Sequence, residues 1–368
     1  MTMCDEMEEK ERRVRHFLQS NGLRAVLLKR QANFSWMTCG GLNTIGIATE
    51  IGGASLLITE TAKYLISNNI EAPRMIQEEE VEKQGFAVKT FSWHEDLEAI
   101  LVRSLVGKGL VASDVFVPDT RLMAEDIARL RYSLTPEEIE RYRWLGERAS
   151  RAVERTLLET ARGEKESEVV GRLCRELWTD RIDPVVLMVA ADDRISRFRH
   201  PIPTERRIDK MLMLSVNARK GGLVVCLTRF VRFGTVPPAL QKQYEANAHV
   251  DCTLMAHTRP GIPARDVLQK GLDAYREQGF PDEWKLHHQG GPIGYQPRDY
   301  RVHPGTPDLI QENQAFTWNP SITGTKSEDT ILAIANGPEM ITPPLLYPTL
   351  SVEAAGVRFI RPAILEKA

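Results

Sequence analysis

The sequence predicts a two-domain protein of mixed α/β class. Its 368 residues are too many for one ordinary domain. Candidate strands and helices alternate through the first third of the chain, and a helix start follows at Thr135. Two similar helix-plus-strand segments then recur about a hundred residues apart. We therefore expect a small α/β domain at 1–132 and a larger domain at 133–368, with two pseudo-symmetric halves of helices and antiparallel sheet.

Short aliphatic runs mark the strands of the first domain. A helix is expected over 8–21, where Asn21-Gly22 ends it. The remaining elements are expected to be strands at 23–28, 54–59, 64–67, 86–91 and 114–118, with a helix at 95–105.

The second domain should open with a long helix. Thr135 can cap it, Pro136 suits its first turn, and acidic residues follow at the positive end of the helix dipole. Arg162-Gly163 and Pro260-Gly261 each precede a further amphipathic helix, which is the basis of the predicted internal repeat. Strands are expected at 211–217, 223–233, 314–319 and 330–334, with hairpin turns at Gly221-Gly222 and Asn336-Gly337.

Composition excludes several classes of function. The formal charge of -2 provides no basic field for nucleic acid or an anionic membrane. The five cysteines form no CxxC pair, which argues against a disulfide framework and a structural zinc site. The charged N-terminus lacks the apolar core of a signal peptide, and no apolar run suits a membrane helix. We expect a cytoplasmic protein.

Four segments carry a family resemblance. They are SLTPEEIERYRWLGERAS, RFRHPIPTERRIDK, MLMLSVNARKGGLVVCLTRFV, and the stretch from LHHQGGPIG through QAFTWNPSITGTKSEDTILAIANGPEMIT. Their order along the chain and the separations between them resemble those of the creatinase/aminopeptidase P superfamily, peptidase family M24. This superfamily includes prolidase and has the pita-bread fold. GLRAVLLKRQANFSWMTCG is similar to the N-terminal domain of that family. The resemblance covers nearly the whole chain and implies a cleft in the second domain.

The resemblance also implies where a metal site would lie. The metallopeptidases of the family hold two divalent ions with two aspartates, one histidine and two glutamates, because hard cations need anionic oxygens. These positions fall here on Ser215, Cys226, Gly291, Asn319 and Glu328. A single carboxylate cannot hold two dications, so we expect no dinuclear site and no cofactor. A mononuclear zinc site of Cys226, a histidine and Glu328 is an alternative.

Creatinase, which lacks the metal ligands, suggests a metal-independent chemistry. Its catalytic histidine matches His200, and one of its glutamates matches Glu328. His200 is then a candidate general base, with Glu328 orienting it. The plainer alternatives are a structural histidine and a local salt bridge. The other creatinase glutamate falls on Thr228, so creatine is not supported as the substrate.

Further polar residues are candidates for substrate binding. Arg298 could clamp a carboxylate, although an ion pair with Asp299 is the plainer account. Cys226 could be a nucleophile but lies in an apolar run typical of core packing. The full set of binding candidates is His287, His288, Arg298, Asn319, Cys226 and Ser215.

Three functional hypotheses follow. The first is a metal-independent hydrolase that cleaves an amide, amidine or peptide C–N bond in a small molecule or short peptide. The second is a catalytically silent protein that uses the cleft to bind a ligand or a protein. The third is a metal-dependent Xaa-Pro peptidase. The resemblance also implies a homodimer.

Overall fold

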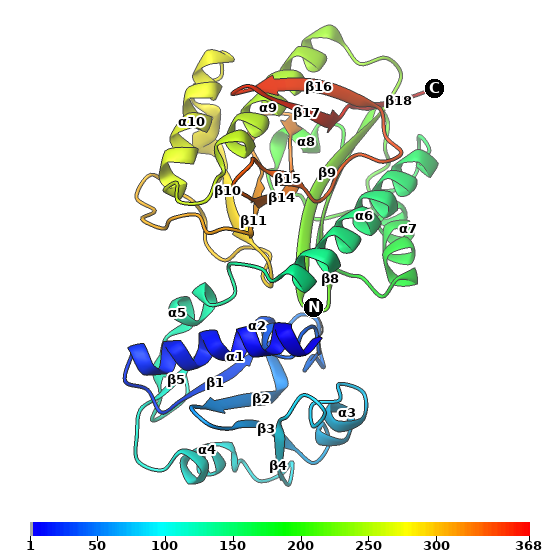
Figure 1. The fold of residues 1–368 in the computed structure, drawn as a ribbon. Coiled ribbons are helices and arrows are strands. Elements are labelled where there is room, and N and C mark those ends of the chain that lie inside the picture. The colour runs from blue at the N-terminus through cyan, green and yellow to red at the C-terminus, as the bar shows by residue number, and fades with distance from the viewer. Residues whose placement is uncertain (1–2) are drawn as a thin grey trace. The chain divides into compact units, whose positions relative to one another are not determined.

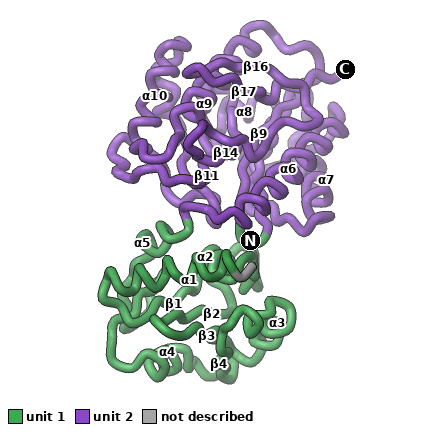
Figure 2. The backbone as a smooth tube through the Cα atoms, in the orientation of Figure 1, with its two compact units in different colours: residues 1–131, 221–223 green, residues 132–220, 224–368 purple. Residues whose placement is uncertain are grey.

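The computed structural model describes residues 3–368, with side chains from residue 5 onward. Figure 2 shows two compact units: residues up to 131 with 221–223, and residues 132–220 with 224–368. Each unit is described by itself. Among the described residues, no helix combines the length and the apolar character needed to cross a membrane.

Unit 1 is built on one six-stranded mixed sheet with the order β4-β3-β2-β1-β5-β6. The central strand β1 is buried from Ala25 to Leu28 and pairs antiparallel with β2 and parallel with β5. The strands are β1 Ala25–Arg30, β2 Ile51–Thr59, β3 Lys63–Asn68, β4 Ala87–Phe91, β5 Val111–Ser113 and β6 Arg121–Leu122; the helices are α1 Met3–Ser20, α2 Gln31–Met37, α3 Ala72–Gln77, α4 Glu98–Val106 and α5 Ala124–Arg129.

Several elements of unit 1 differ from the prediction. No strand forms at 114–118, and the strand lies before it at Val111–Ser113, because the Asp114 carboxylate instead accepts hydrogen bonds from the backbone of Lys29 and Arg30. Helices α3 and α5 and strand β6 were not predicted, and neither was helix α2. All of its residues are buried, so no amphipathic pattern marks it.

Unit 2 contains two four-stranded sheets, ordered β18-β9-β8-β7 and β10-β11-β14-β15. In Figure 1, helices α6 and α7 lie beside the first sheet, and α9 and α10 lie on the other side of the unit. The helices are α6 Pro136–Glu159, α7 Glu166–Thr179, α8 Arg194–Arg197, α9 Pro238–His257, α10 Ala264–Glu277 and the 3-10 turn η1 Glu283–Leu286. The strands are β7 Asp183–Ala191, β8 Met211–Lys220, β9 Leu223–Phe233, β10 Gly290–Ile293, β11 Gln314–Trp318, β12 Ser321–Ile322, β13 Thr325–Lys326, β14 Asp329–Ala333, β15 Glu339–Met340, β16 Thr349–Ala354, β17 Val357–Pro362 and β18 Leu365–Lys367.

The start of α6 follows the local sequence. The Thr135 hydroxyl accepts from the backbone N–H of Glu138, whose carboxylate accepts from the backbone N–H of Thr135. This capping box satisfies two backbone donors that a helix start leaves open.

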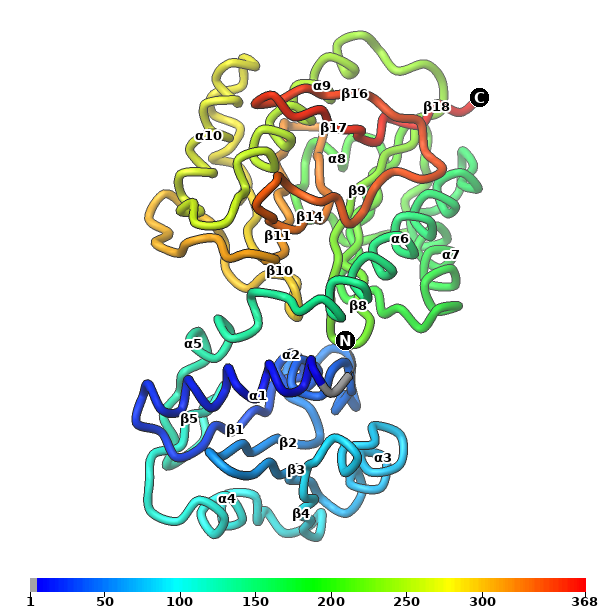
Figure 3. The backbone as a smooth tube through the Cα atoms, in the orientation of Figure 1, coloured from blue at the N-terminus to red at the C-terminus, as the bar shows by residue number. Residues whose placement is uncertain are grey.

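The internal repeat is present in the backbone hydrogen bonds. The N–H of Gly163 donates to the carbonyl of Ile208 over 2.8 Å, and the N–H of Gly261 donates to the carbonyl of Ile310 over the same distance. Each glycine lies shortly before the start of one helix of a packed pair, α7 against α6 and α10 against α9 (Figure 3). The predicted fold class is therefore confirmed, with its two helix-plus-sheet halves. Strand β7 and the β16–β17 hairpin were not predicted.

Candidate active site

The candidate site is built around a buried carboxylate, Glu328, on the segment that leads into β14. Glu328 Oε2 accepts from the Thr228 hydroxyl at 2.7 Å and from the Ser215 hydroxyl at 2.9 Å. Ser215 lies on β8 and Thr228 on β9, and all three side chains are buried. The tertiary fold thus joins Ser215 and Glu328, two of the predicted site residues.

Lys326 completes this cluster. Its Nζ lies 2.8 Å from Glu328 Oε2 and 3.3 Å from the Ser215 hydroxyl, in a place almost closed to solvent. Burial opposes ionisation of Glu328, but the Lys326 ammonium and the two hydroxyl donors outweigh it, so its pKa lies below the ordinary value. Lys326 was not among the residues predicted for the site. Its position two residues before Glu328 was the available signal, because alternate residues of an extended segment share a face.

The other predicted positions around Glu328 offer no further anionic oxygen. Burial, followed by the charge of Glu328, raises the pKa of the Cys226 thiol to about 12, so the thiol stays protonated. Asn319 is buried and its Oδ1 has no hydrogen-bond partner among the described residues. A protonated thiol and a neutral amide are weak ligands for hard cations.

Gly291 cannot carry a side chain in this backbone. A Cβ placed there would lie 2.4 Å from the carbonyl oxygen of Tyr300. That distance is far inside van der Waals contact, and the obstacle is backbone, which cannot swing away. The position that the family resemblance assigns to a histidine ligand is therefore closed to any side chain.

Arg298 is directed toward the strands of the second sheet. Its Nη1 donates to the carbonyl of Thr317 at 2.8 Å and to the carbonyl of Gly291 at 2.5 Å. This guanidinium therefore braces β10 against β11, in addition to any contact that it makes with a substrate.

Three histidines converge next to this cluster. His200 lies on the loop between α8 and β8, whereas His287 and His288 lie between η1 and β10. Nε2 of His287 lies 3.2 Å from Nε2 of His200, and Nδ1 of His287 lies 3.4 Å from the Ser321 hydroxyl. The three predicted histidines thus come together. Within residues 3–368, however, no hydrogen bond joins His200 to Glu328, which was the expected pair.

All three imidazoles favour the neutral form. Burial and then Lys326 lower the pKa of His287 to about 2, and burial and then Arg298 lower that of His288 to about 4. The pKa of His200 is also lowered, by burial and by Lys326. At neutral pH each ring therefore keeps a lone pair for a proton or a metal ion.

A cavity of about 560 Å³ adjoins these rings. It is lined by His287, His288, Trp284, Arg301 and Val302, among others. Its volume lies within the range of sites for small molecules.

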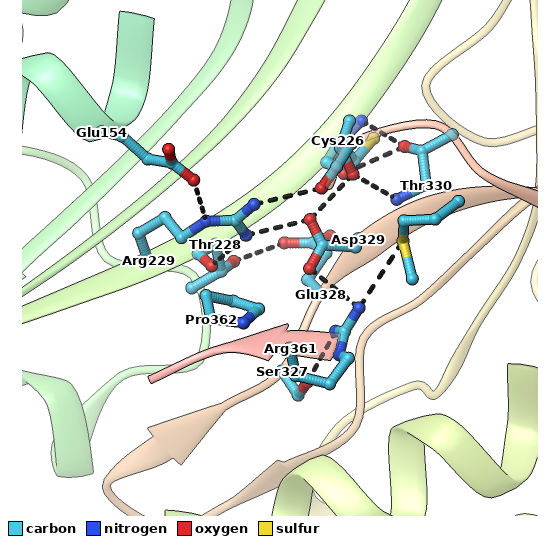
Figure 4. A network of polar contacts seen from close by, with 12 residues as sticks. Glu154, Cys226, Thr228, Arg229, Ser327, Glu328, Asp329, Thr330, Arg361 and Pro362 are labelled. Atoms are coloured by element: carbon cyan, nitrogen blue, oxygen red, sulfur yellow. Dashed lines mark hydrogen bonds and ion pairs between the residues drawn. The ribbon is translucent and has the colours of Figure 1, made fainter. Parts of the chain in front are cut away.

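A buried ionic network underlies Glu328 (Figure 4). The Asp329 carboxylate accepts from Arg229 Nη1 at 2.9 Å and lies 3.0 Å from Arg361 Nη1, while Glu154 pairs with Arg229 on its other side. Asp329 directly follows Glu328, so these contacts fix the backbone that positions the carboxylate. Breaking such a buried pair typically costs about 3–5 kcal/mol.

The sequence of the second unit matches a family profile. Residues 140–343 match metallopeptidase family M24. The chain belongs to this family. The predicted superfamily is thereby confirmed.

Individual relatives agree with this assignment. The Xaa-Pro dipeptidase of Pyrococcus horikoshii is 22% identical over 353 residues, which covers 92% of this chain and 98% of that protein. The crystal structure of a prolidase from Thermococcus sibiricus superposes with a TM-score of 0.79 at 18% identity, covering 100% of both chains.

A domain whose name does not mention a peptidase shares the fold. The N-terminal domain of the FACT complex subunit SPT16 from Cicer arietinum superposes with a TM-score of 0.69 at 11% identity, covering 92% of this M24 chain and 97% of that chain. At these identities the superpositions show the fold alone.

Proposed function

We propose that this M24 protein is a hydrolase that cleaves a C–N bond in a small molecule or short peptide without the dinuclear metal centre of its family. The observation that carries the proposal is the Lys326–Glu328 pair. An ammonium 2.8 Å from the one remaining carboxylate supplies the positive charge that a metal ion would otherwise bring. The donor set does not fit two divalent cations, because Ser215, Cys226 and Asn319 are neutral and Gly291 has no room for a side chain.

His200 is the proposed general base. It is the exposed member of the imidazole cluster, so water and a substrate can reach this residue. His287 is the positioning residue: with its Nδ1–H directed to Ser321, its Nε2 accepts from the Nε2–H of His200. The Nδ1 lone pair of His200 is then directed away from the pair. This contact replaces the expected orienting role of Glu328.

The reaction is a hydrolysis in which water supplies the oxygen of the new C–O bond and the proton of the new N–H bond. His200 Nδ1 takes a proton from water while the water oxygen attacks the carbonyl or amidine carbon. The C–N bond then breaks, and the imidazolium returns the proton to the leaving nitrogen. The cavity beside His287 and His288 would hold the substrate. Arg298 and Asn319 remain proposed substrate contacts, although neither residue lines this cavity.

The test is turnover by protein freed of metal with a chelator. N-acyl amino acids, amidines and Xaa-Pro dipeptides are offered to the wild type, to His200→Ala and to the control His249→Ala, which alters a histidine on α9. We expect one substrate class to be hydrolysed without metal, with kcat lowered about 10²–10⁴-fold by His200→Ala alone. Activity that requires two bound metal ions per chain would refute the proposal in favour of an Xaa-Pro peptidase.

The second candidate is a binding protein without catalysis. The observation that favours it is that, among the described residues, no carboxylate accepts a hydrogen bond from the His200 imidazole. The same fold in the FACT subunit domain means that the scaffold alone does not decide between the two. If no turnover depends on His200 while one of the offered compounds raises the melting temperature, the binding function is the correct one.

A further inference from the structure

Three imidazoles outside the family's metal-ligand positions lie close enough to share an ion. One ring nitrogen from each of His200, His287 and His288 lies within 4.8 Å of the other two. The ring centroids are 4.5 Å apart for His287 and His288 and 5.0 Å apart for His200 and His287. Three side chains from two separate segments thus converge on one point.

We propose that His200, His287 and His288 form a site for one divalent transition-metal ion of the zinc class. Zinc binds histidine nitrogen at about 2.0–2.1 Å, so the nitrogens of a tetrahedral site lie roughly 3.3 Å apart. The Nε2 atoms of His200 and His287 are already 3.2 Å apart. The nitrogen of His288 lies within 4.8 Å of them, so it must approach by up to about 1.5 Å, and the exposed His200 can adjust to it. Three protein ligands leave the fourth position for water or an anion.

An unsatisfied nitrogen supports the same conclusion. Nδ1 of His288 is buried and has no hydrogen-bond partner among the described residues. A buried polar atom without a hydrogen-bond partner destabilises the fold. A bound ion, or a ligand in the fourth position, would give this nitrogen a partner. The Ser321 hydroxyl, 3.4 Å from Nδ1 of His287, is placed to fix the ring orientation of that ligand.

Charge sets the expected affinity. Lys326, Arg199, Arg298 and Arg301 all lie within electrostatic range of the three rings. Lys326 is neutralised by Glu328, and Arg199 by Glu283 at 2.9 Å. The two remaining arginines oppose a dication, so the dissociation constant should be on the order of micromolar rather than nanomolar. Arg301 is exposed and can be changed without disturbing the ligands.

A zinc ion bound at the three histidines would affect the proposed hydrolysis. A lone pair of His200 that ligates an ion cannot take a proton from water, so zinc would inhibit a reaction that uses His200 as its base. This consequence rests on the proposed function, whereas the site itself does not. The experiment therefore measures binding and spectra and not turnover.

The full-length protein, stripped with a chelator, is titrated with Zn²⁺ by calorimetry and with Co²⁺ by visible absorption. We expect one equivalent to bind and Co²⁺ to give the intense bands of four-coordination. His287→Ala and His288→Ala should each weaken binding by at least about tenfold to 100-fold. The matched control His303→Ala, a neighbouring histidine outside the cluster, should bind as the wild type does, and Arg301→Gln should bind a few-fold more tightly.

Other results would overturn the site. Binding that is absent up to millimolar metal, or that survives both His287→Ala and His288→Ala, refutes it. Circular dichroism checks that each variant is folded, and His200→Ala, at an exposed position, serves as the third ligand test if a buried variant fails to fold. Metal binding without turnover would refute the proposed function alone, and turnover without metal binding would refute this inference alone.

Discussion

The ammonium of Lys326 lies 2.8 Å from Oε2 of Glu328, and both side chains are nearly inaccessible to solvent. Each charge therefore depends on the other, since water can hydrate neither. In this M24 chain, the carboxylate that the family resemblance assigns to a metal-ligand position is held by a lysine and two hydroxyls from neighbouring strands.

Removing the lysine should destabilise the protein. Lys326→Met leaves Glu328 buried without its counter-charge, and we expect a loss of about 3–5 kcal/mol in the free energy of unfolding, measured with urea. The double variant with Glu328→Gln should recover much of this loss, because no unpaired charge remains. The control Lys285→Met, which breaks an exposed pair with Asp282, should change stability by less than about 0.5 kcal/mol. Equal effects of the two lysine variants would contradict the pairing.

The Lys326–Glu328 pair also predicts that the free energy of unfolding depends on pH. The folded-state pKa of Glu328 is lowered, so its stabilising contribution is present above the unfolded value and is lost as the pH falls through the folded value. In Lys326→Met, burial should instead raise this pKa, and that variant loses stability as the pH rises. The stability gap between wild type and variant should therefore be smaller at pH 4 than at pH 7. A gap that is constant with pH would count against a charged Glu328.

Gly291 should tolerate no side chain. Gly291→Ala places a Cβ 2.4 Å from a backbone oxygen, and we expect a loss of about 1–3 kcal/mol in unfolding free energy. Gly294→Ala is the matched control, since Gly294 has a similar φ of +156° but no atom within 4 Å of the added carbon. Its cost should be clearly smaller. If the two substitutions cost the same, backbone strain and not the collision explains the glycine.

Asp329 should be the residue of the ionic network most sensitive to neutralisation. Asp329→Asn removes the charge that faces both Arg229 and Arg361, and we expect about 3–5 kcal/mol of destabilisation. Chemical unfolding measures this, with the exposed Asp282→Asn as control. Glu154 also pairs with Arg229, and Asp251 lies 2.6 Å from Arg361. A loss below about 1 kcal/mol would show that these two carboxylates suffice for the two arginines.

Much of the fold was predictable because it rests on local signals. The α6 start at Thr135, the β8–β9 hairpin and the repeated glycine before α7 and α10 each follow from short-range preferences of the chain. Helix α2 and the end of β5 were not predictable in this way. The first is wholly buried, and the second is decided by hydrogen bonds that the Asp114 carboxylate accepts from residues far away in the sequence.

The sequence by itself determined which residue types stand at the candidate positions: one glutamate, three histidines and, where the family resemblance places the metal ligands, no second acid. Only the tertiary structure decided how they pair. It joins Glu328 to Lys326 and not to His200, and it brings His200 to His287 across 87 residues of chain. The physical reason is that a buried charge takes whichever partner the packed strands place within hydrogen-bonding distance. That distance depends on the register of strands distant in sequence, which no local preference encodes.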